Sequence, residues 1–269
     1  MLAPHKLPES YASWNRRWGA PIGFPLAARL PVRARLLPLV GRYFAGMFSL
    51  QSNSASREFE YPWAWDVAGV RPGMTCVDVG AGHSGFPFVL SASGARSRLV
   101  DPFLRFSAEP SYEVSPESIV ARMNRAFGTH VELVHDTLDH AALPDASVDR
   151  LFCISALEHM PDAAIAAIAR EAGRILKPAG RFILTVDLFL DIAPFTTEPH
   201  NEFGRNIDVR AFVESTGLRV DGGLTSELHG YPEFDSQRIQ ARLRDYLVSR
   251  SYPVLTQCLV LSKPGAGTP

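Results

Sequence analysis

Hydrophobic and polar positions alternate regularly only from about residue 71 onward. There, short apolar runs with strand character are followed by stretches with helical spacing, an order that predicts a parallel sheet with helices on both faces. The expected strands cover 75–79, a run ending at 99–101, 131–134, 148–155 and 181–187, then 218–224 and 254–261. The pattern predicts a doubly wound α/β domain with a mostly parallel, seven-stranded sheet.

Capping residues predict where the helices between these strands begin and end. Ser115 followed by Pro116 is typical of a helix start, and Gly128 of its end. Asp162 is expected to cap a helix whose apolar positions fall on one face. Further helices are expected over 85–93, near 208–215 and, with several arginines, near 235–250.

The first 56 residues lack a regular period and are rich in proline, arginine and aromatic residues. Only two patches, 11–18 and 36–48, have helical spacing, so an irregular helical N-terminal cap is predicted. The polar run 51–56 marks its end, and Ser56 is a candidate cap for a helix through residue 68. We expect a second unit over 57–264, with acceptor-side insertions near 188–207 and 225–252.

Composition restricts the function classes. The chain has 269 residues, 46% of them hydrophobic, and a formal net charge of −1, which excludes a globally basic nucleic-acid coat. No run of eighteen apolar residues occurs, so no membrane span is expected, and a cytoplasmic protein is the default. Residues 1–50 are locally basic, which fits either a solvated helical face or attraction to an anionic substrate, partner or surface. The cysteines Cys76, Cys153 and Cys258 lie in apolar runs and are expected to be buried.

Candidate chemistry begins where the first strand meets a glycine turn. Gly80, Gly82 and Gly85 have the G-x-G-x-x-G spacing that lets backbone N–H groups approach a ligand, although a purely structural turn has the same spelling. Asp101 ends the second strand, where a carboxylate accepts hydrogen bonds from both hydroxyls of an adenosine ribose. These residues predict an adenosine cofactor without separating NAD from S-adenosylmethionine.

Asp78 helps to separate these two cofactors. It lies inside the strand end, two residues before Gly80, where dehydrogenases usually carry a small apolar residue. The ammonium group of S-adenosylmethionine needs an acceptor, and a carboxylate pointing at the turn provides one. The alternative is a carboxylate that only braces the glycine loop.

Four motifs in order carry a resemblance to a known family. They are Val77-Asp78-Val79-Gly80-Ala81-Gly82, Leu99-Val100-Asp101, Leu143-Pro144-Asp145-Ala146-Ser147-Val148-Asp149 and Leu176-Lys177-Pro178-Ala179-Gly180. Together they resemble the class I S-adenosylmethionine-dependent methyltransferases, most of all the small-molecule branch called type 11, over roughly 71–187. Residues 57–63 are also similar to a bacterial subset with Glu-Tyr-Pro-Trp in its N-terminal helix. The resemblance implies a Rossmann-like methyltransferase fold.

The resemblance also implies roles for individual residues. Asp136 matches the acid that accepts from the adenine amino group, and Ser155 matches the wall under the methionine part. The cofactor-binding residues it implies are Tyr61, Asp78, Gly80, Ala81, Gly82, His83, Asp101, Pro102, Asp136, Thr137, Leu138, Ser155 and Ala156. Arg57 and Tyr61 are candidates to cover the methionine carboxylate, with helix packing and surface charge as the rival role.

Methyl transfer is an in-line displacement, so a dedicated base is optional. His159 is the first candidate base because it follows the fourth strand, at the edge of the sheet where ligands bind. His83 is expected to touch the cofactor, His200 is a third candidate, and a purely structural histidine remains the alternative for each. The sequence has Glu158-His159 where the family often carries two histidines, which puts an inherited role for the pair in doubt. No metal is expected.

Three other interpretations stay open. An NAD-dependent oxidoreductase is opposed by Asp78 and by the Leu-Pro-Asp segment. A methyltransferase-like protein with other chemistry or a regulatory role is not excluded by any residue. RNA or protein methylation would use the arginines near 238–250, but no RNA-binding motif occurs. We expect a small-molecule acceptor, with an anionic or carrier-bound one also compatible with the arginines. The acceptor itself and the oligomeric state stay open.

Overall fold

A seven-stranded sheet forms the centre of the molecule. The computed structural model describes residues 1–24, 45–51, 53–104, 114–249 and 252–264. The strands are β1 (Thr75–Val79), β2 (Arg96–Val100), β3 (Glu132–Val134), β4 (Val148–Ile154), β5 (Leu176–Phe189), β6 (Arg219–Gly222) and β7 (Val254–Ser262), in the order β3-β2-β1-β4-β5-β7-β6. The first five are parallel, and β7 is antiparallel to both β5 and β6. The predicted mostly parallel, seven-stranded α/β sheet is confirmed.

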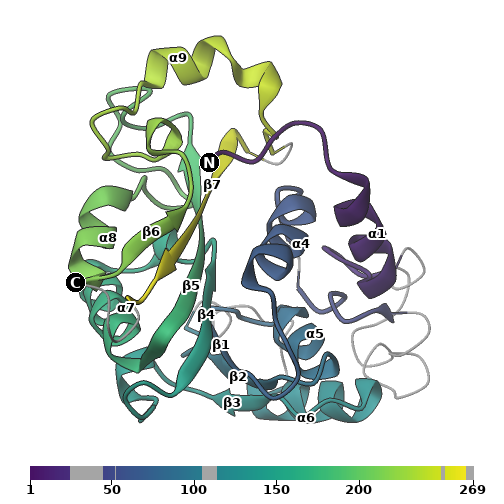
Figure 1. The fold of residues 1–269 in the computed structure, drawn as a ribbon. Coiled ribbons are helices and arrows are strands. Elements are labelled where there is room, and N and C mark those ends of the chain that lie inside the picture. The colour runs from purple at the N-terminus through teal and green to yellow at the C-terminus, as the bar shows by residue number, and fades with distance from the viewer. Residues whose placement is uncertain (25–44, 52, 105–113, 250–251, 265–269) are drawn as a thin grey trace.

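Helices cover both faces of this sheet (Figure 1). They are α1 (Glu9–Trp18), α4 (Arg57–Ala68), α5 (Phe86–Ala92), α6 (Pro116–Phe127), α7 (Asp162–Ile175), α8 (Val209–Thr216) and α9 (Ser236–Ala241), with short 3₁₀ helices η3 (Leu138–His140), η4 (Leu157–His159), η5 (Thr225–Glu227) and η6 (Leu243–Asp245). Helices α1, α4, α5 and α6 pack on one face of the sheet, and α7 and α8 pack on the other. A large apolar core lies between the sheet and the helices on each face. All three cysteines are buried in these cores, as predicted.

Two predicted boundaries were wrong. Asp162 does not cap α7, because Pro161 takes the cap position and the Asp162 carboxylate pairs with Arg205. An acidic residue in the first turn still favours the helix through its dipole. Strand β5 begins at Leu176 instead of residue 181, because Leu176 pairs with Val148 before a register shift.

The basic helix predicted over 235–250 is much shorter. Asp235 caps it by accepting from the backbone N–H groups of Gln237 and Arg238, but α9 ends at Ala241. Tyr246 then forms an isolated bridge with Pro4, which requires extended backbone. Pairing with the N-terminal segment therefore overrides the helical spacing of this stretch.

The N-terminal segment packs onto the sheet domain. The predicted patch 11–18 is confirmed as α1, whose Tyr11 ring lies 5.5 Å from that of Phe59 in α4. The patch 36–48 falls mostly on residues 25–44, outside the described residues. Leu2 forms a bridge with Gln257 of β7, so the N-terminal segment contacts both α4 and β7. The division at residue 56 stays a prediction.

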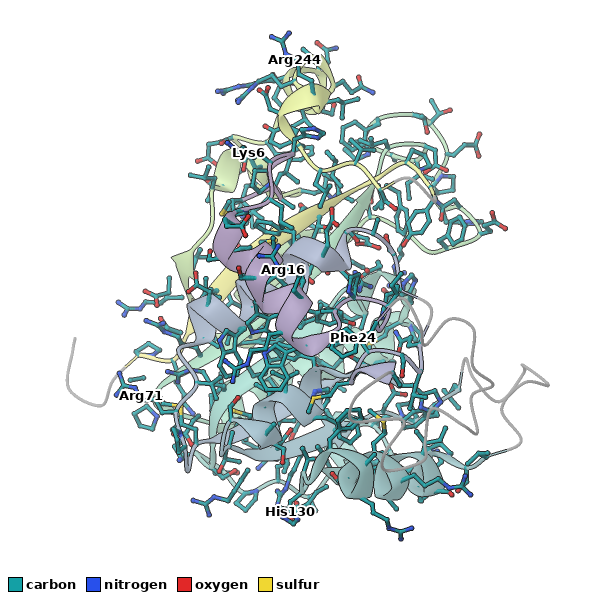
Figure 2. All side chains as sticks on the ribbon, turned by 90° about the vertical axis from the view of Figure 1, so that its right-hand side faces the viewer. Lys6, Arg16, Phe24, Arg71, His130 and Arg244 are labelled. Carbon is teal, nitrogen blue, oxygen red and sulfur yellow. The ribbon has the colours of Figure 1, made fainter. Side chains whose placement is uncertain are left out.

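Among the described residues, basic side chains lie at several separate places on the surface. Figure 2 shows Arg244 at one end of the molecule, Arg16 near the middle and Arg71 toward the other end. Arg16 pairs with Glu9, and Arg242 pairs with Asp245. Within the described residues, no helix has the length and apolar character needed to cross a membrane.

Candidate functional site

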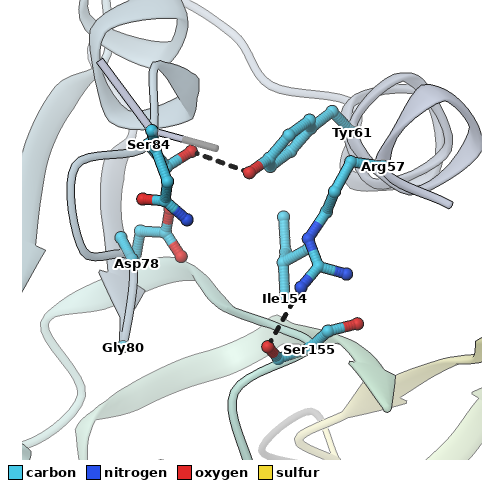
Figure 3. Close-up of a pocket in the computed structure, with 9 residues that line it drawn as sticks. Arg57, Tyr61, Asp78, Gly80, Ser84, Ile154 and Ser155 are labelled. Carbon is cyan, nitrogen blue, oxygen red and sulfur yellow. Dashed lines mark hydrogen bonds between the residues drawn. The ribbon is translucent and has the colours of Figure 1, made fainter. Parts of the chain in front are cut away.

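A pocket lies at the carboxyl ends of β1 and β4, beside helix α4. Figure 3 shows Asp78 and Ser84 on one side of it and Arg57 and Ser155 on the other. Its lining residues are Gln51, Arg57, Tyr61, Asp78, Gly80, Ala81, Ser84, Ile154 and Ser155. It therefore brings together five predicted cofactor residues with Arg57, and adds Gln51, Ser84 and Ile154, which the sequence had not assigned.

Position 80 in the glycine turn leaves no space for a side chain. Gly80 has a φ of +70°, and a Cβ there would lie 2.8 Å from Ala156 Cβ and Met160 Cε. Gly82 also has a positive φ, of +54°. Both the backbone conformation and the close approach of the loop after β4 therefore require glycine at position 80.

Asp78 is a buried carboxyl group that faces the pocket. The residue is 2% exposed, and no described residue places a donor within hydrogen-bond distance of its Oδ1. Burial, with a smaller contribution from Asp101, raises the pKa of Asp78 well above its usual range. A cation bound in the pocket would favour the ionised form and supply the missing donor.

Asp101 braces the glycine turn. Its Oδ2 accepts from the Gly82 N–H at 2.8 Å, and its Oδ1 accepts from the Phe103 N–H at 2.6 Å. Each carboxylate oxygen has a second lone pair, so these bonds leave acceptor capacity for a ribose. Pro102 sits between the two braced segments, and neither it nor Asp101 lines the pocket.

The residues predicted to bind the adenine, Asp136, Thr137 and Leu138, lie outside the pocket. The Asp136 carboxylate is half exposed and accepts from the Thr137 N–H at 2.7 Å, with His140 Nδ1 at 3.2 Å. Leu138 is buried in the core beneath α7. None of these three residues lines the pocket, so their adenine role stays a prediction.

A cluster of buried charged side chains lies on the side of the pocket opposite Asp78. Arg57 Nη1 donates to Glu60 Oε1 and Oε2 at 2.7 and 2.8 Å, and Nη2 donates to the Ser155 carbonyl at 3.2 Å. Asp187 Oδ1 lies 3.9 Å from Arg57 Nη1. Glu60 and Asp187 are both fully buried, and Arg57 is the direct ion-pair partner of Glu60.

The Ser155 hydroxyl lies between these two carboxyl groups. Its Oγ is 2.7 Å from Glu60 Oε2 and 3.1 Å from Asp187 Oδ1. One hydroxyl hydrogen cannot be donated to both, so a second proton is needed between them. Burial raises the pKa of Asp187 to about 8, which is consistent with a protonated Asp187 donating to Ser155.

His159 lies beside this cluster and does not line the pocket. Its Nδ1 is within hydrogen-bond distance of the Phe203 carbonyl, which only accepts, so Nδ1 carries the hydrogen and Nε2 is an acceptor in the neutral ring. Nε2 lies 4.0 Å from Glu158 Oε1. Glu158, His159 and Asp187 offer ligand atoms within 4.8 Å of one another, the only such group of three among the described residues.

The other two histidines occupy different environments. His200 lies exposed in the loop after β5. His83 is 4% exposed, packs against Phe103 with ring centroids 5.0 Å apart, and does not line the pocket. Burial lowers the pKa of His83 to about 4, so the ring is neutral at pH 7.

Sequence reasoning did not find a role for Glu60. It appeared only as a letter of the Glu-Tyr-Pro-Trp motif, although an acid between the apolar residues Phe59 and Tyr61 is itself a signal. Fully buried acids are rare unless paired, and here both neighbours are also buried.

The chain is similar in sequence to known methyltransferases. Residues 77–184 match the family model described as "Methyltransferase domain". The chain is 26% identical to a ubiquinone biosynthesis O-methyltransferase of Vibrio campbellii over 183 residues, which cover 62% of this chain and 72% of that protein. It is 29% identical to the enzyme of the same name from Proteus mirabilis, over 62% of this chain and 69% of that one.

Two solved structures share the fold. A putative sarcosine dimethylglycine methyltransferase from Galdieria sulphuraria has a TM-score of 0.51 at 17% identity, covering 77% of this chain and 85% of its own. The 4+2 cyclase SpnF has a TM-score of 0.54 at 14% identity, covering 91% of this chain and 98% of its own. At these identities the likeness concerns the fold alone.

We predict that His83 makes the protein acid-sensitive. Between pH 6.5 and about 4 the unfolded chain binds a proton at this ring while the folded chain does not, so stability falls as pH falls. The full loss is on the order of 3 kcal/mol. Denaturant unfolding of His83→Gln against wild type should show a flatter decline over this range. His130→Gln, at an exposed position, is the control; identical declines for wild type and His83→Gln would contradict the prediction.

Proposed function

We propose that this chain, a class I S-adenosylmethionine-dependent methyltransferase whose residues 77–184 match the methyltransferase family model, methylates an oxygen or nitrogen atom of a small-molecule acceptor. The observation that carries the site is the Oδ1 of Asp78, which has no hydrogen-bond partner among the described residues and faces Arg57 across one pocket. An α-amino acid has an ammonium group and a carboxylate a few bonds apart. An acid on one wall and a guanidinium on the other match those two charges.

These residues fit the methionine part of the cofactor. Asp78 would accept from the ammonium group, and Arg57, already oriented by Glu60, would donate to the carboxylate. When bound, S-adenosylmethionine supplies an activated methyl group. Asp101 would take the ribose hydroxyls with the lone pairs that Gly82 and Phe103 leave available, and His83 would pack beside the turn as a neutral ring. Asp136, Thr137 and Leu138 remain the candidates for the adenine.

The chain would act mainly by holding its two reactants in line. Orientation of this kind supplies roughly 7 to 11 kcal/mol in well-ordered reactions. Ser155 and Ala156, which close β4, would form the floor between donor and acceptor. The relatives are named O-methyltransferases of ubiquinone biosynthesis, which favours oxygen as the methylated atom. The acceptor would be bounded by the N-terminal segment and by the loops after β5 and β6.

The proposal predicts selective stabilisation by the product of the donor. S-adenosylhomocysteine at a hundred times its Kd should stabilise the fold by about 2.7 kcal/mol, which raises Tm by roughly 5 to 10 °C for a chain of this size. NAD should leave Tm unchanged. Thermal melts with each ligand test this, and a shift caused by NAD alone would overturn the proposal.

Asp78→Asn is the control for the position of the site. It removes the group that becomes the carboxylate beside the ammonium, at nearly constant shape, so the Kd of S-adenosylhomocysteine should rise at least tenfold. The unliganded protein should melt at the same or a higher temperature, because a buried unpartnered carboxyl group is lost. Asp101 is a poorer probe because its carboxylate also braces the turn.

His159 is proposed as the base that takes the acceptor's proton. The Phe203 carbonyl fixes its ring so that Nε2 is the accepting atom. His159→Ala should lower kcat by about a hundredfold or more with a hydroxyl acceptor and change the Kd of S-adenosylhomocysteine less than threefold. A panel of small hydroxyl and amine compounds with methyl-labelled donor provides the assay. Unchanged turnover would return His159 to a structural role.

We also expect methyl transfer to survive chelation. The Arg57 guanidinium lies 3.9 Å from Asp187 Oδ1 and already supplies positive charge beside the group of Glu158, His159 and Asp187. A second cation there would be repelled by it. Activity measured before and after EDTA treatment tests this point. Loss of activity with rescue by magnesium would assign a metal to those three residues.

A further inference from the structure

The pocket contains a second buried oxygen that has no donor. Besides Asp78 Oδ1, the side-chain Oε1 of Gln51 is buried without a hydrogen-bond partner among the described residues. Gln51 lines the same pocket, although it lies in the N-terminal segment, before α4. Two unsatisfied acceptors on one cavity imply a ligand group with several donors.

Neighbouring hydrogen bonds decide which atom of the Gln51 amide faces Asn53 and which faces the pocket. Asn53 Nδ2 lies 2.6 Å from the Pro21 carbonyl oxygen, which only accepts. The atom of Asn53 that faces Gln51 is therefore its oxygen, Oδ1. That oxygen lies 3.2 Å from Gln51 Nε2, which must therefore be the amide nitrogen. Gln51 Oε1 is then the acceptor that no donor in the described part of the chain reaches.

A second chain of bonds fixes the same arrangement from the glycine turn. The Phe86 N–H donates to Ser84 Oγ at 3.1 Å, and Ser84 Oγ donates to the Tyr61 hydroxyl at 3.2 Å (Figure 3). Tyr61 then donates to Asn53 Oδ1 at 3.3 Å. Asn53 Oδ1 thus receives two donors, one from Tyr61 and one from Gln51. The polar side chains between the turn and the N-terminal segment form one directional relay.

We infer that Gln51 binds the ammonium group of the methyl donor with its side-chain oxygen, as a second acceptor beside Asp78. An ammonium group has three donors, and one carboxylate oxygen satisfies one of them. The inference rests on the proposed function, because it takes S-adenosylmethionine as the ligand. It also gives the N-terminal segment a specific role, which is to complete the donor site.

The test compares two ligands that differ in the amino acid part. S-adenosylhomocysteine carries the ammonium group, and 5′-methylthioadenosine lacks both the ammonium group and the carboxylate. Gln51→Leu should raise the Kd of S-adenosylhomocysteine about tenfold, as expected for one hydrogen bond to a charged group. The Kd of 5′-methylthioadenosine should change less than twofold. Isothermal titration with both ligands measures these values.

Two further variants separate ligand binding from folding. Gln51→Glu keeps an acceptor for the ligand but loses the N–H that donates to Asn53 Oδ1, so its Kd for S-adenosylhomocysteine should lie between those of wild type and Gln51→Leu. Gln237→Leu makes the same substitution as Gln51→Leu at an exposed site in α9 and should change neither Kd.

Three results would overturn the inference. They are an unchanged Kd of S-adenosylhomocysteine in Gln51→Leu, an equal loss for both ligands, and a loss in Gln51→Glu as large as in Gln51→Leu. If the wild-type protein does not bind S-adenosylhomocysteine, the proposed function fails instead, and the two failures are therefore distinguishable.

Discussion

The buried carboxylate of Glu60 is the interaction on which the site depends. It accepts from Arg57 of its own helix, and its remaining acceptor positions are filled by hydroxyl groups of Ser155 after β4, Thr185 of β5 and Thr256 of β7 at 2.7, 2.7 and 3.2 Å. A charge removed from water in this way costs several kcal/mol unless its partners are in place. Because three of these partners belong to or directly follow strands of the sheet, α4 can dock in only one position.

That docking determines the electrostatics of the pocket. Ionised Glu60 holds Arg57 on the side of the pocket opposite Asp78. Burial raises the pKa of Asp187, and the nearby Glu158 and Glu60 add to this shift. The pocket therefore has the Arg57 guanidinium on one side and the Asp78 carboxyl group on the other. This separation of charge is a property of helix and strand packing, not of the glycine turn alone.

The sequence predicted well those features that depend on neighbours along the chain. The strand before Gly80, the capping by Ser115 and the order of strands and helices follow from local spacing, and the structure confirms them. The end of α9 could not be predicted, because it depends on a bridge between Tyr246 and Pro4. Glu60 was missed for the same reason, since its hydroxyl partners Thr185 and Thr256 lie 125 and 196 residues away. Gln51 required knowledge of which buried atoms lack a partner, which no pattern of letters contains.

Gly85 joins the glycine turn to the N-terminal segment. A Cβ at this position would lie 2.6 Å from the carbonyl carbon and oxygen of Met47, so the start of α5 and the segment before Gln51 are in direct backbone contact. Any displacement of Met47 away from α5 therefore also moves Gln51 relative to Asp78. The contact between Met47 and the start of α5 therefore helps to position Gln51 on the pocket.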